Sequence, residues 1–267
     1  MSRTLAEVFD DTRSHNRAAL IGYLPAGFPD AQRAVELITD MVAAGVDIVE
    51  VGLPYSDPLM DGPDIQAAVD QALTAGATPD VVLDTVAQVV AAGATALVMS
   101  YWNPIERYGT DRFADRMASA GGAGVITPDL TPEEAGAWIS ATDRTDLDRV
   151  FLVAPSSTDQ RIETVAAVTS GFLYAASTMG VTGARTQVSS AAPGLVRRAR
   201  ALTDLPIAVG LGVSTGDQAS EVASYADGVI VGSAFVRRIL QAPDHESARA
   251  GVRELAAELA EGVRRRP

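Results

Sequence analysis

Short apolar runs alternate with longer amphipathic runs along the whole chain. The short runs are rich in Val, Ile, Leu and Ala, as buried strands are, and the longer runs repeat their apolar positions at helical spacing. The pattern predicts strands at residues 19–24, 47–51, 96–101, 122–127, 149–153, 172–176, 206–209 and 228–231. It predicts helices at residues 5–15, 30–44, 64–75, 79–92, 131–141, 159–169, 193–202, 217–225, 233–240 and 246–265.

The order of these elements predicts an α/β fold. Buried strands that alternate with helices in this way fit a parallel sheet closed on itself, a (β/α)8 TIM barrel, here with an extra N-terminal helix. A doubly wound open sheet is the alternative, although it usually has fewer strands or a second domain. No linker, low-complexity stretch or change of composition marks a boundary, so residues 1–267 are predicted to form a single (β/α)8 barrel domain.

Several predicted helices are preceded by residues that cap helices. Asp30 and Thr78 stand before two of them, and Pro79 occupies a first helical position. The segment Thr131-Pro-Glu-Glu134 matches the capping box, in which the side chains of a Thr and of a Glu three residues later each accept from the other's backbone N–H. We therefore expect a helix to begin at this segment.

The balance of charges narrows the range of partners. The formal net charge is −13 and the pI is about 4.5, whereas nucleic-acid-binding proteins carry basic surface, so no nucleic-acid partner is expected. The N-terminus lacks the apolar core of a signal peptide, and no run approaches the ~18 apolar residues of a membrane span. These features predict a cytoplasmic protein with no membrane partner. The absence of cysteine excludes disulfides and thiolate metal ligands.

The most informative segment is residues 49–63, where a buried strand leads into an acid-rich loop. Glu50 lies within the apolar run, and a buried carboxylate is costly unless it has a partner or a function. Asp57 and Asp61 follow among prolines. Each residue alone has a structural explanation: Glu50 could pair with an arginine or cap a loop, and the aspartates could form turns. Together, two carboxylates in different surroundings are how proteins separate acid from base roles.

Glycine-rich turns follow the last two predicted strands. They read Val209-Gly-Leu-Gly-Val-Ser214 and Val229-Ile-Val-Gly-Ser-Ala234. In TIM barrels the loops after strands seven and eight often build a phosphate site with a short extra helix, for which residues 233–240 are the candidate. Ordinary tight turns explain a single Gly-X-Gly better, but the pair on consecutive strands favours phosphate. Residues 177–187, after the sixth strand, suit either a mobile lid or a long surface loop.

The other residue types restrict the chemistry. His15 and His245 lie in terminal helical regions, and the sequence has no Ser-His-Asp arrangement, paired metal histidines or Walker loop, so no metal site is predicted. All 21 basic residues are arginine, which excludes a Schiff-base lysine. Carboxylates and a tyrosine remain, and these suit proton transfer rather than acyl transfer.

The segment Glu-Val-Gly-Leu-Pro-Tyr-Ser-Asp-Pro-Leu-Met-Asp-Gly-Pro, residues 50–63, resembles the signature of the tryptophan synthase alpha chain family. The likeness covers nearly the whole chain, because residues 23–29, 101–104, 174–177, 180–183, 210–214 and 232–233 follow the family's order and spacing. The resemblance implies a (β/α)8 lyase that cleaves indole-3-glycerol phosphate to indole and glyceraldehyde 3-phosphate. It also implies a tryptophan synthase beta chain as partner in an alpha2beta2 complex. Pyridoxal phosphate would belong to that beta chain, with no cofactor in this chain.

The resemblance also implies roles for individual residues. Glu50 would carry protons to indole C3 and from the neighbouring glycerol hydroxyl, and Asp61 would accept from the indole N–H. The substrate would further contact Tyr174 beside Glu50, Tyr23, Leu211 and Ile230 around the indole ring, and backbone N–H groups of Gly183, Gly212, Gly232 and Ser233 at the phosphate. Thr182 would reach Asp61 when the loop at residues 177–187 closes. The face turned toward the partner would carry Asp57, Asn103-Pro104 and Asp129.

The chain departs from the family pattern in two places, and two other functions would be compatible with part of the same motifs. Tyr23 stands where many members carry phenylalanine, and Thr178-Met179 replaces a common Arg-Ala pair. Another phosphate-binding barrel of tryptophan or histidine biosynthesis, an isomerase or a synthase, would need the glycine turns but not the pair of Glu50 and Asp61. A non-catalytic barrel that only activates its partner is the second rival.

Overall fold

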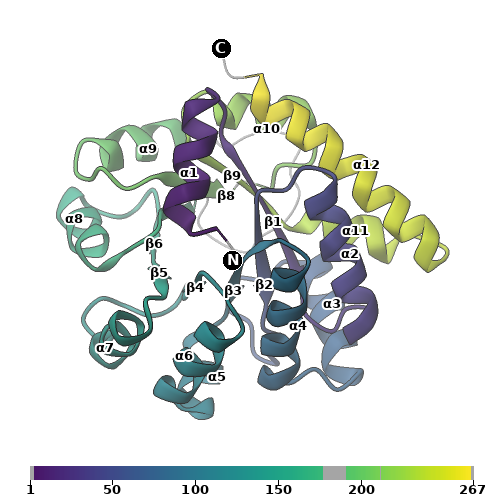
Figure 1. Cartoon of the computed structure of the whole chain (residues 1–267). Helices are drawn as coiled ribbons and strands as arrows, with labels where there is room; N and C mark the ends of the chain where they lie inside the picture. The colour runs from purple at the N-terminus through teal and green to yellow at the C-terminus, as the bar shows by residue number, and fades with distance from the viewer. Residues whose placement is uncertain (1–2, 177–190, 211, 266–267) are drawn as a thin grey trace.

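The structure is a computed structural model that describes residues 3–176, 191–210 and 212–265. Within these residues the strands are β1 (Ala19–Pro25), β2 (Ile48–Gly52), β3 (Thr95–Met99), β4 (Gly124–Ile126), β5 (Asp148–Val150), β6 (Leu152–Val153), β7 (Leu173–Ala176), β8 (Ile207–Gly210) and β9 (Gly228–Val231). The helices are α1 (Leu5–Ser14), α2 (Ala31–Ala43), α3 (Pro63–Thr74), α4 (Pro79–Ala91), α5 (Trp102–Tyr108), α6 (Thr110–Ser119), α7 (Gly136–Thr145), α8 (Asp159–Val168), α9 (Ala192–Arg200), α10 (Gly216–Ala223), α11 (Ser233–Leu240) and α12 (His245–Arg264). Figure 1 shows the strands at the centre with helices around them.

The strands form one parallel sheet that closes into a barrel. Neighbours follow the order β5-β4-β3-β2-β1-β9-β8-β7-β6. Only Phe151 separates β5 from β6, which stand at the two ends of this order, and the Phe151 carbonyl accepts from the Tyr174 N–H of β7 at 3.2 Å. β5 and β6 are therefore two parts of one barrel strand. The predicted (β/α)8 barrel with an extra N-terminal helix is confirmed.

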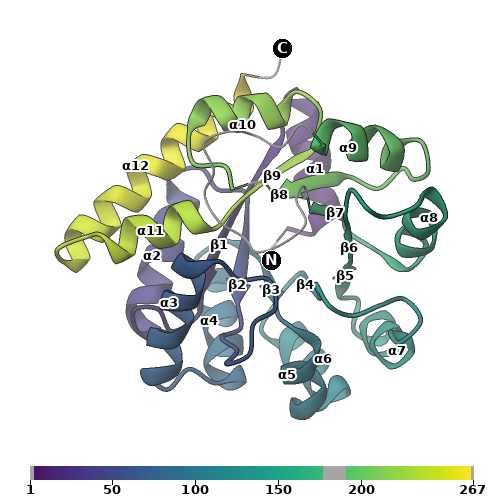
Figure 2. The ribbon, with the colours of Figure 1, turned by 180° about the vertical axis from the view of Figure 1, so that it is seen from behind.

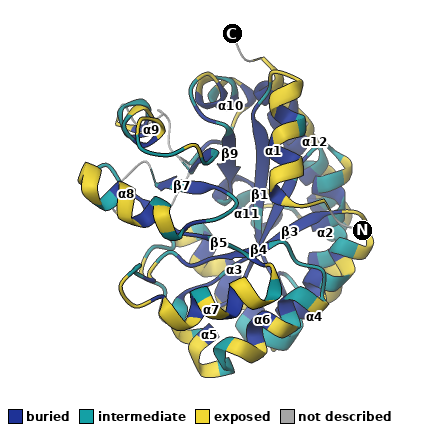
Figure 3. Cartoon of the chain, turned by 60° about the vertical axis from the view of Figure 1, so that its left-hand side comes forward, coloured by how far each residue is buried: buried dark blue, intermediate teal, exposed yellow. Residues whose placement is uncertain are grey.

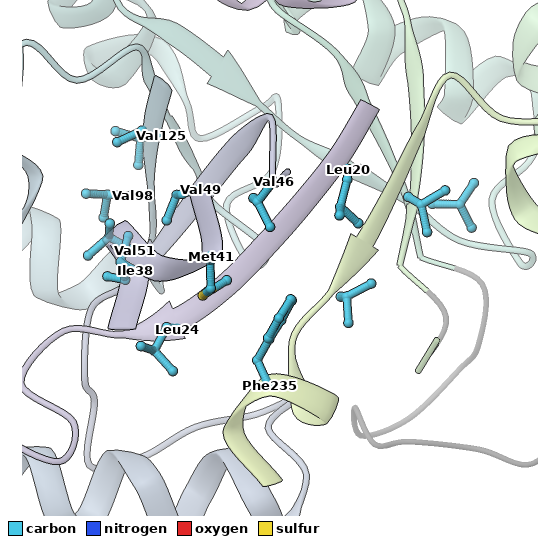
Figure 4. Close-up of a cluster of buried hydrophobic side chains, with 14 of the residues drawn as sticks. Leu20, Leu24, Ile38, Met41, Val46, Val49, Val51, Val98, Val125 and Phe235 are labelled. Atoms are coloured by element: carbon cyan, nitrogen blue, oxygen red, sulfur yellow. The ribbon is translucent and has the colours of Figure 1, made fainter. Parts of the chain in front are cut away.

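Side chains along each strand point alternately to the helices and to the barrel interior. In β2, Val49 and Val51 pack in the outer layer between strands and helices, whereas Ile48 packs in the interior. Figure 4 shows the outer layer, in which Val51 lies near Ile38 of α2. Glu50 stands between two outward-facing valines, so its side chain faces the barrel interior.

The first helix closes one end of the barrel. Leu5, Val8 and Phe9 of α1 belong to the interior apolar cluster, and the ring centroid of Phe9 lies 5.7 Å from that of Phe172. α1 lies in front of the strands in Figure 1 and behind them in Figure 2, so it covers one barrel end only. Phe172 precedes β7, which places α1 at the end where the strands begin. The carboxyl ends of the strands, where barrels carry their chemistry, are at the opposite end.

Most predicted helices are present, with exposed outer sides and buried inner sides (Figure 3). Asp30 and Thr78 each cap a helix by accepting from the backbone N–H three residues later. The prediction of a helix beginning at Thr131 is wrong, because α7 begins at Gly136. The Thr131 hydroxyl donates to the Glu134 carboxylate at 3.0 Å, and this local bond replaces the backbone contact that a capping box requires.

The helices α5 and α6, between β3 and β4, are not predicted by the sequence pattern. Gly109 separates them at φ +99°, a conformation that favours glycine and ends helices. The buried face of α6 consists of Phe113, Ala114 and Met117. This spacing is helical but spans little more than one turn, which is too short a signal to stand out.

Candidate active site

Glu50 occupies the barrel interior near the carboxyl end of β2. Its residue is 2% exposed, and its Oε1 has no hydrogen-bond partner in the part of the chain that the structure describes. Burial raises the pKa of Glu50 to about 8, so the side chain is mostly a neutral carboxylic acid at pH 7. Burial alone accounts for this shift, and an arginine partner would have opposed it. Among the described residues, Glu50 therefore has no arginine partner of the kind that the sequence left open.

Two tyrosines lie beside Glu50 in the interior. Tyr23 of β1 is its register partner in the sheet, and Tyr174 of β7 packs on the interior cluster. Burial and then the charge of Glu50 raise the pKa of Tyr174, while burial and then the charges of Asp61 and Glu50 raise the pKa of Tyr23. Because such charge effects decline with distance, both phenols lie near Glu50, and Tyr23 lies near Asp61 as well.

Glycines on neighbouring strands leave room for both tyrosine rings. A Cβ on Gly52 of β2 would lie 2.5 Å from the Tyr23 hydroxyl, and a Cβ on Gly210 of β8 would overlap the Tyr174 hydroxyl. A Cβ on Gly232, directly after β9, would lie 3.2 Å from the Tyr23 ring. The approaches at Gly52 and Gly210 are too close for any Cβ, and the one at Gly232 is tighter than most Cβ contacts. These three glycines therefore shape the tyrosine side of the site.

Asp61, in the loop after β2, is held by Tyr101. The Tyr101 hydroxyl donates to Asp61 Oδ1 at 2.9 Å and accepts from the Met60 N–H at 2.9 Å. Burial raises the pKa of Asp61, and the hydrogen bond from Tyr101 opposes that rise. The sequence pattern gives Tyr101 no role in binding Asp61. The signal for it is its position just after β3, at the same barrel end as the acid loop.

The glycine turns lie at this same barrel end. Gly212 follows β8 at φ +68°, a conformation that favours glycine. Gly232 is the N-cap of α11, which begins at Ser233, and the first N–H groups of a helix are free of intrahelical partners. Ile230 of β9 packs in the barrel interior. The predicted phosphate and indole contacts of these residues stay predictions.

Three predicted site residues lie outside the described residues: Thr182, Gly183 and Leu211. Residues 177–187, for which the sequence allows a mobile lid or a long surface loop, lie there as well. In residues 3–176, 191–210 and 212–265, no group of three or more His, Cys, Asp or Glu side chains could hold a metal ion. Within the same ranges, no helix has the length and apolar character needed to cross a membrane.

The loops after β3 and β4 join the acid loop at the barrel rim. Asp129 accepts from the Trp102 N–H at 2.9 Å, and Asn103 donates to the Tyr55 hydroxyl at 3.0 Å. The ring centroid of Tyr55 lies 5.6 Å from that of Tyr101, the residue that holds Asp61. The residues predicted to face a partner are thus connected to the catalytic candidates through one chain of contacts.

Comparisons with known proteins identify the family. The sequence model of the family "Tryptophan synthase alpha chain" matches residues 9–264. The chain belongs to the tryptophan synthase alpha chain family. The tryptophan synthase alpha chain of Thermobifida fusca is 59% identical over 267 residues, which cover 99% of this chain and 97% of the relative. That of Acidothermus cellulolyticus is 56% identical over 263 residues, 98% of each chain.

Solved structures agree with this membership in the tryptophan synthase alpha chain family. A structure of Mycobacterium tuberculosis tryptophan synthase has a chain with 52% identity and a TM-score of 0.91, and the match covers 99% of both chains. The tryptophan synthase alpha subunit of Legionella pneumophila has 30% identity and a TM-score of 0.87, with 98% of both chains covered. The family resemblance carried by residues 50–63 is confirmed.

Proposed function

We propose that this chain is a tryptophan synthase alpha subunit that cleaves indole-3-glycerol phosphate to indole and glyceraldehyde 3-phosphate by a retro-aldol reaction. The observation that carries the proposal is the pair of buried Glu50 and partly buried Asp61 at the carboxyl end of a barrel of this family. An isomerase or synthase barrel would require the glycine turns without this pair. The two carboxyl groups differ in their surroundings, as an acid and a charge-stabilising group should.

Glu50 enters the reaction as the acid. Because its pKa is about 8, it carries a proton at pH 7 and can give that proton to indole C3. The protonated ring is cationic, and its N–H donates to the Asp61 carboxylate, which stabilises the positive charge. Tyr101 supports this role, since its hydrogen bond to Asp61 favours the charged form.

The Glu50 carboxylate left by the first step then acts as the base. It removes the proton of the glycerol hydroxyl next to the ring, the C–O bond becomes a carbonyl, and the carbon–carbon bond breaks. The electron pair of that bond neutralises the cationic ring and gives indole. Glu50 is protonated again at the end, so one residue serves as acid and as base without a net change.

The remaining predicted residues bind the substrate. With a net charge of −13 the chain holds a phosphate best through local backbone donors, which Gly183, Gly212, Gly232 and Ser233 would supply. Tyr23, Leu211 and Ile230 would surround the indole ring, and Tyr174 would lie beside Glu50. Thr182 would reach Asp61 from the loop after β7.

The partner is a tryptophan synthase beta chain in an alpha2beta2 complex, which receives the indole and holds the pyridoxal phosphate, so this chain needs no cofactor of its own. Leu59 lies in the same loop as Asp57. Among the described residues it is the one large hydrophobic side chain that is exposed, at 73%. Hydrogen bonds hold the loops of Asn103 and Asp129 at the same rim. An exposed apolar side chain at this rim is suited to burial against that partner.

The test is to supply indole-3-glycerol phosphate to the purified chain, with and without a beta chain, and to follow indole release. Absence of turnover in both cases would reject the lyase function. Glu50→Gln and Asp61→Asn separate the enzyme from a mere activator of the partner. Both variants should still bind the beta chain and support its reaction with added indole, while losing their own indole release.

A further inference from the structure

Tyr23 brings a polar group into a part of the site that the family pattern treats as apolar. Its side chain is partly buried, and its hydroxyl lies 2.5 Å from the position that a Cβ on Gly52 would occupy. Gly52 follows Glu50 by two residues on β2, and residues two apart share one face of a strand. The hydroxyl of Tyr23 therefore faces the same interior space as the Glu50 carboxyl group.

The hydrogen-bonding capacities of Tyr23 and Glu50 complement each other. A phenol can donate one hydrogen bond, and Glu50 Oε1 has no partner among the described residues. Asp61 differs, because it already accepts from Tyr101. A hydroxyl of the substrate can accept from Tyr23 and donate to Glu50 at the same time, whereas the indole N–H can only donate. The arrangement thus matches an alcohol more closely than it matches an apolar ring.

We propose that Tyr23 is a further catalytic residue, whose hydroxyl donates a hydrogen bond to the oxygen of the glycerol hydroxyl that Glu50 deprotonates. This inference rests on the proposed function. Negative charge grows on that oxygen as its proton moves to Glu50, and a fixed donor stabilises the charged oxygen more than the neutral alcohol. Tyr23 transfers no proton itself. Burial and the charges of Asp61 and Glu50 raise its pKa well above the usual range, so it remains a donor throughout.

The first measurement compares Tyr23→Phe with Tyr225→Phe in the complex with the beta chain. Tyr225 is the control, because its hydroxyl is buried without a partner in the described structure and lies away from the site. It stands two residues before Asp227, whose backbone bonds to Ala19 and Ile207 at the starting end of β1 and β8, far from Glu50. Tyr23→Phe should lower kcat by about tenfold and change KM little, since the lost bond strengthens in the transition state. Tyr225→Phe should leave kcat unchanged.

The second measurement uses an unreactive substrate analogue in which hydrogen replaces the hydroxyl next to the indole ring. Wild type and Tyr23→Phe should bind this analogue within about twofold of each other, because it lacks the group that Tyr23 contacts. An unchanged kcat in Tyr23→Phe would overturn the inference. So would a tenfold weaker binding of the analogue, which would mean that Tyr23 only shapes the ring site. Failure of the proposed function gives a different result, no indole release by the wild-type complex.

Discussion

The two ends of the barrel interior are built from the same strands but serve different purposes. At the starting end the interior is apolar and is closed by Phe9 and its neighbours on α1. A step of two residues along β1, β2 and β7 keeps the same face of each strand and changes its chemistry. The interior residues change from Ile21, Ile48 and Phe172 to Tyr23, Glu50 and Tyr174.

This contrast separates the residues that stabilise the fold from those that carry function. Apolar side chains at the closed end gain free energy from burial, about 1.5–3 kcal/mol for each large one. Glu50 at the open end is buried without a compensating cation among the described residues and lowers stability whenever it is charged. We infer that the free energy gained by burial at the closed end offsets the loss of stability that Glu50 causes at the open end. Each of the following variants tests one of the two ends.

Glu50→Gln should have the largest effect, and its effects on activity and stability should be opposite in sign. Indole release should fall by about 10³-fold, because the variant has neither an acid nor a base. The pKa of Glu50 rises from 4.5 to about 8 on folding, so the folded state keeps a proton that the unfolded chain releases between these pH values. Wild-type stability should therefore fall by about 1.4 kcal/mol for each pH unit across this range.

Urea unfolding of wild type and Glu50→Gln at several pH values measures this difference. The variant lacks the titrating group, so its free energy of unfolding should not follow this decline. The amount by which the stability of the variant exceeds that of the wild type should grow from pH 4.5 to pH 8 and stay constant above pH 8. A difference that does not vary with pH would show that Glu50 is not buried as a neutral acid. Parallel assays of indole release with the beta chain give the loss of activity on the same samples.

Phe9→Ala tests the closed end. Phe9 is 2% exposed and packs on Phe172, so its truncation should lower the free energy of unfolding by about 3–5 kcal/mol. The kcat of the folded protein should stay within about twofold of wild type, since Phe9 lies at the end away from Glu50. Phe9→Leu should cost less, because it leaves a smaller cavity. A large loss of kcat without loss of stability would contradict the division between the two ends.

The sequence predicts the closed end and the barrel more completely than it predicts the site. Buried strands leave long apolar runs, and caps such as Asp30 leave a local signal, so these elements are found from the pattern. Short elements such as α5 and α6 leave too little periodicity. The capping box at Thr131 fails because its side chains bond to each other instead of to the backbone. Local patterns cannot show which of two competing hydrogen bonds forms.

Contacts within the site join residues far apart in the chain, and the sequence gives no direct sign of them. Glu50 and Asp61 stand out because carboxylates in or beside an apolar strand are unusual. The bond between Tyr101 and Asp61, 40 residues apart, depends on β2 and β3 being neighbours in the barrel. The same holds for Gly210, whose lack of a side chain is required by Tyr174 on the adjacent strand.

Gly210→Ala should lower both stability and kcat by disturbing the open end, although it changes neither carboxyl group. The new Cβ would overlap the Tyr174 hydroxyl and displace that ring, at a cost in stability of about 1–3 kcal/mol and with a clear loss of kcat. Gly194→Ala is the matched control, since nothing lies within 4 Å of the added Cβ and alanine favours helix α9 by about 0.5–1 kcal/mol. Adding Tyr174→Phe removes the overlapping oxygen and should recover part of the stability lost in Gly210→Ala. Additive losses in this double variant would rule out the overlap as the cause.

Tyr101→Phe should have the smallest effect, and it acts on the ionisation of Asp61 rather than on packing. The hydrogen bond from Tyr101 opposes the rise that burial imposes on the pKa of Asp61, so its loss should raise that pKa further. The acid side of the pH–rate profile should then move to higher pH, with about a three- to tenfold loss of kcat at neutral pH. Tyr108→Phe is the control, because its hydroxyl also donates to an aspartate, Asp80, but at the outer helices. An acid limb that stays in place in Tyr101→Phe would mean that Asp61 keeps its charge without help. The open end would then depend on Tyr101 for shape alone.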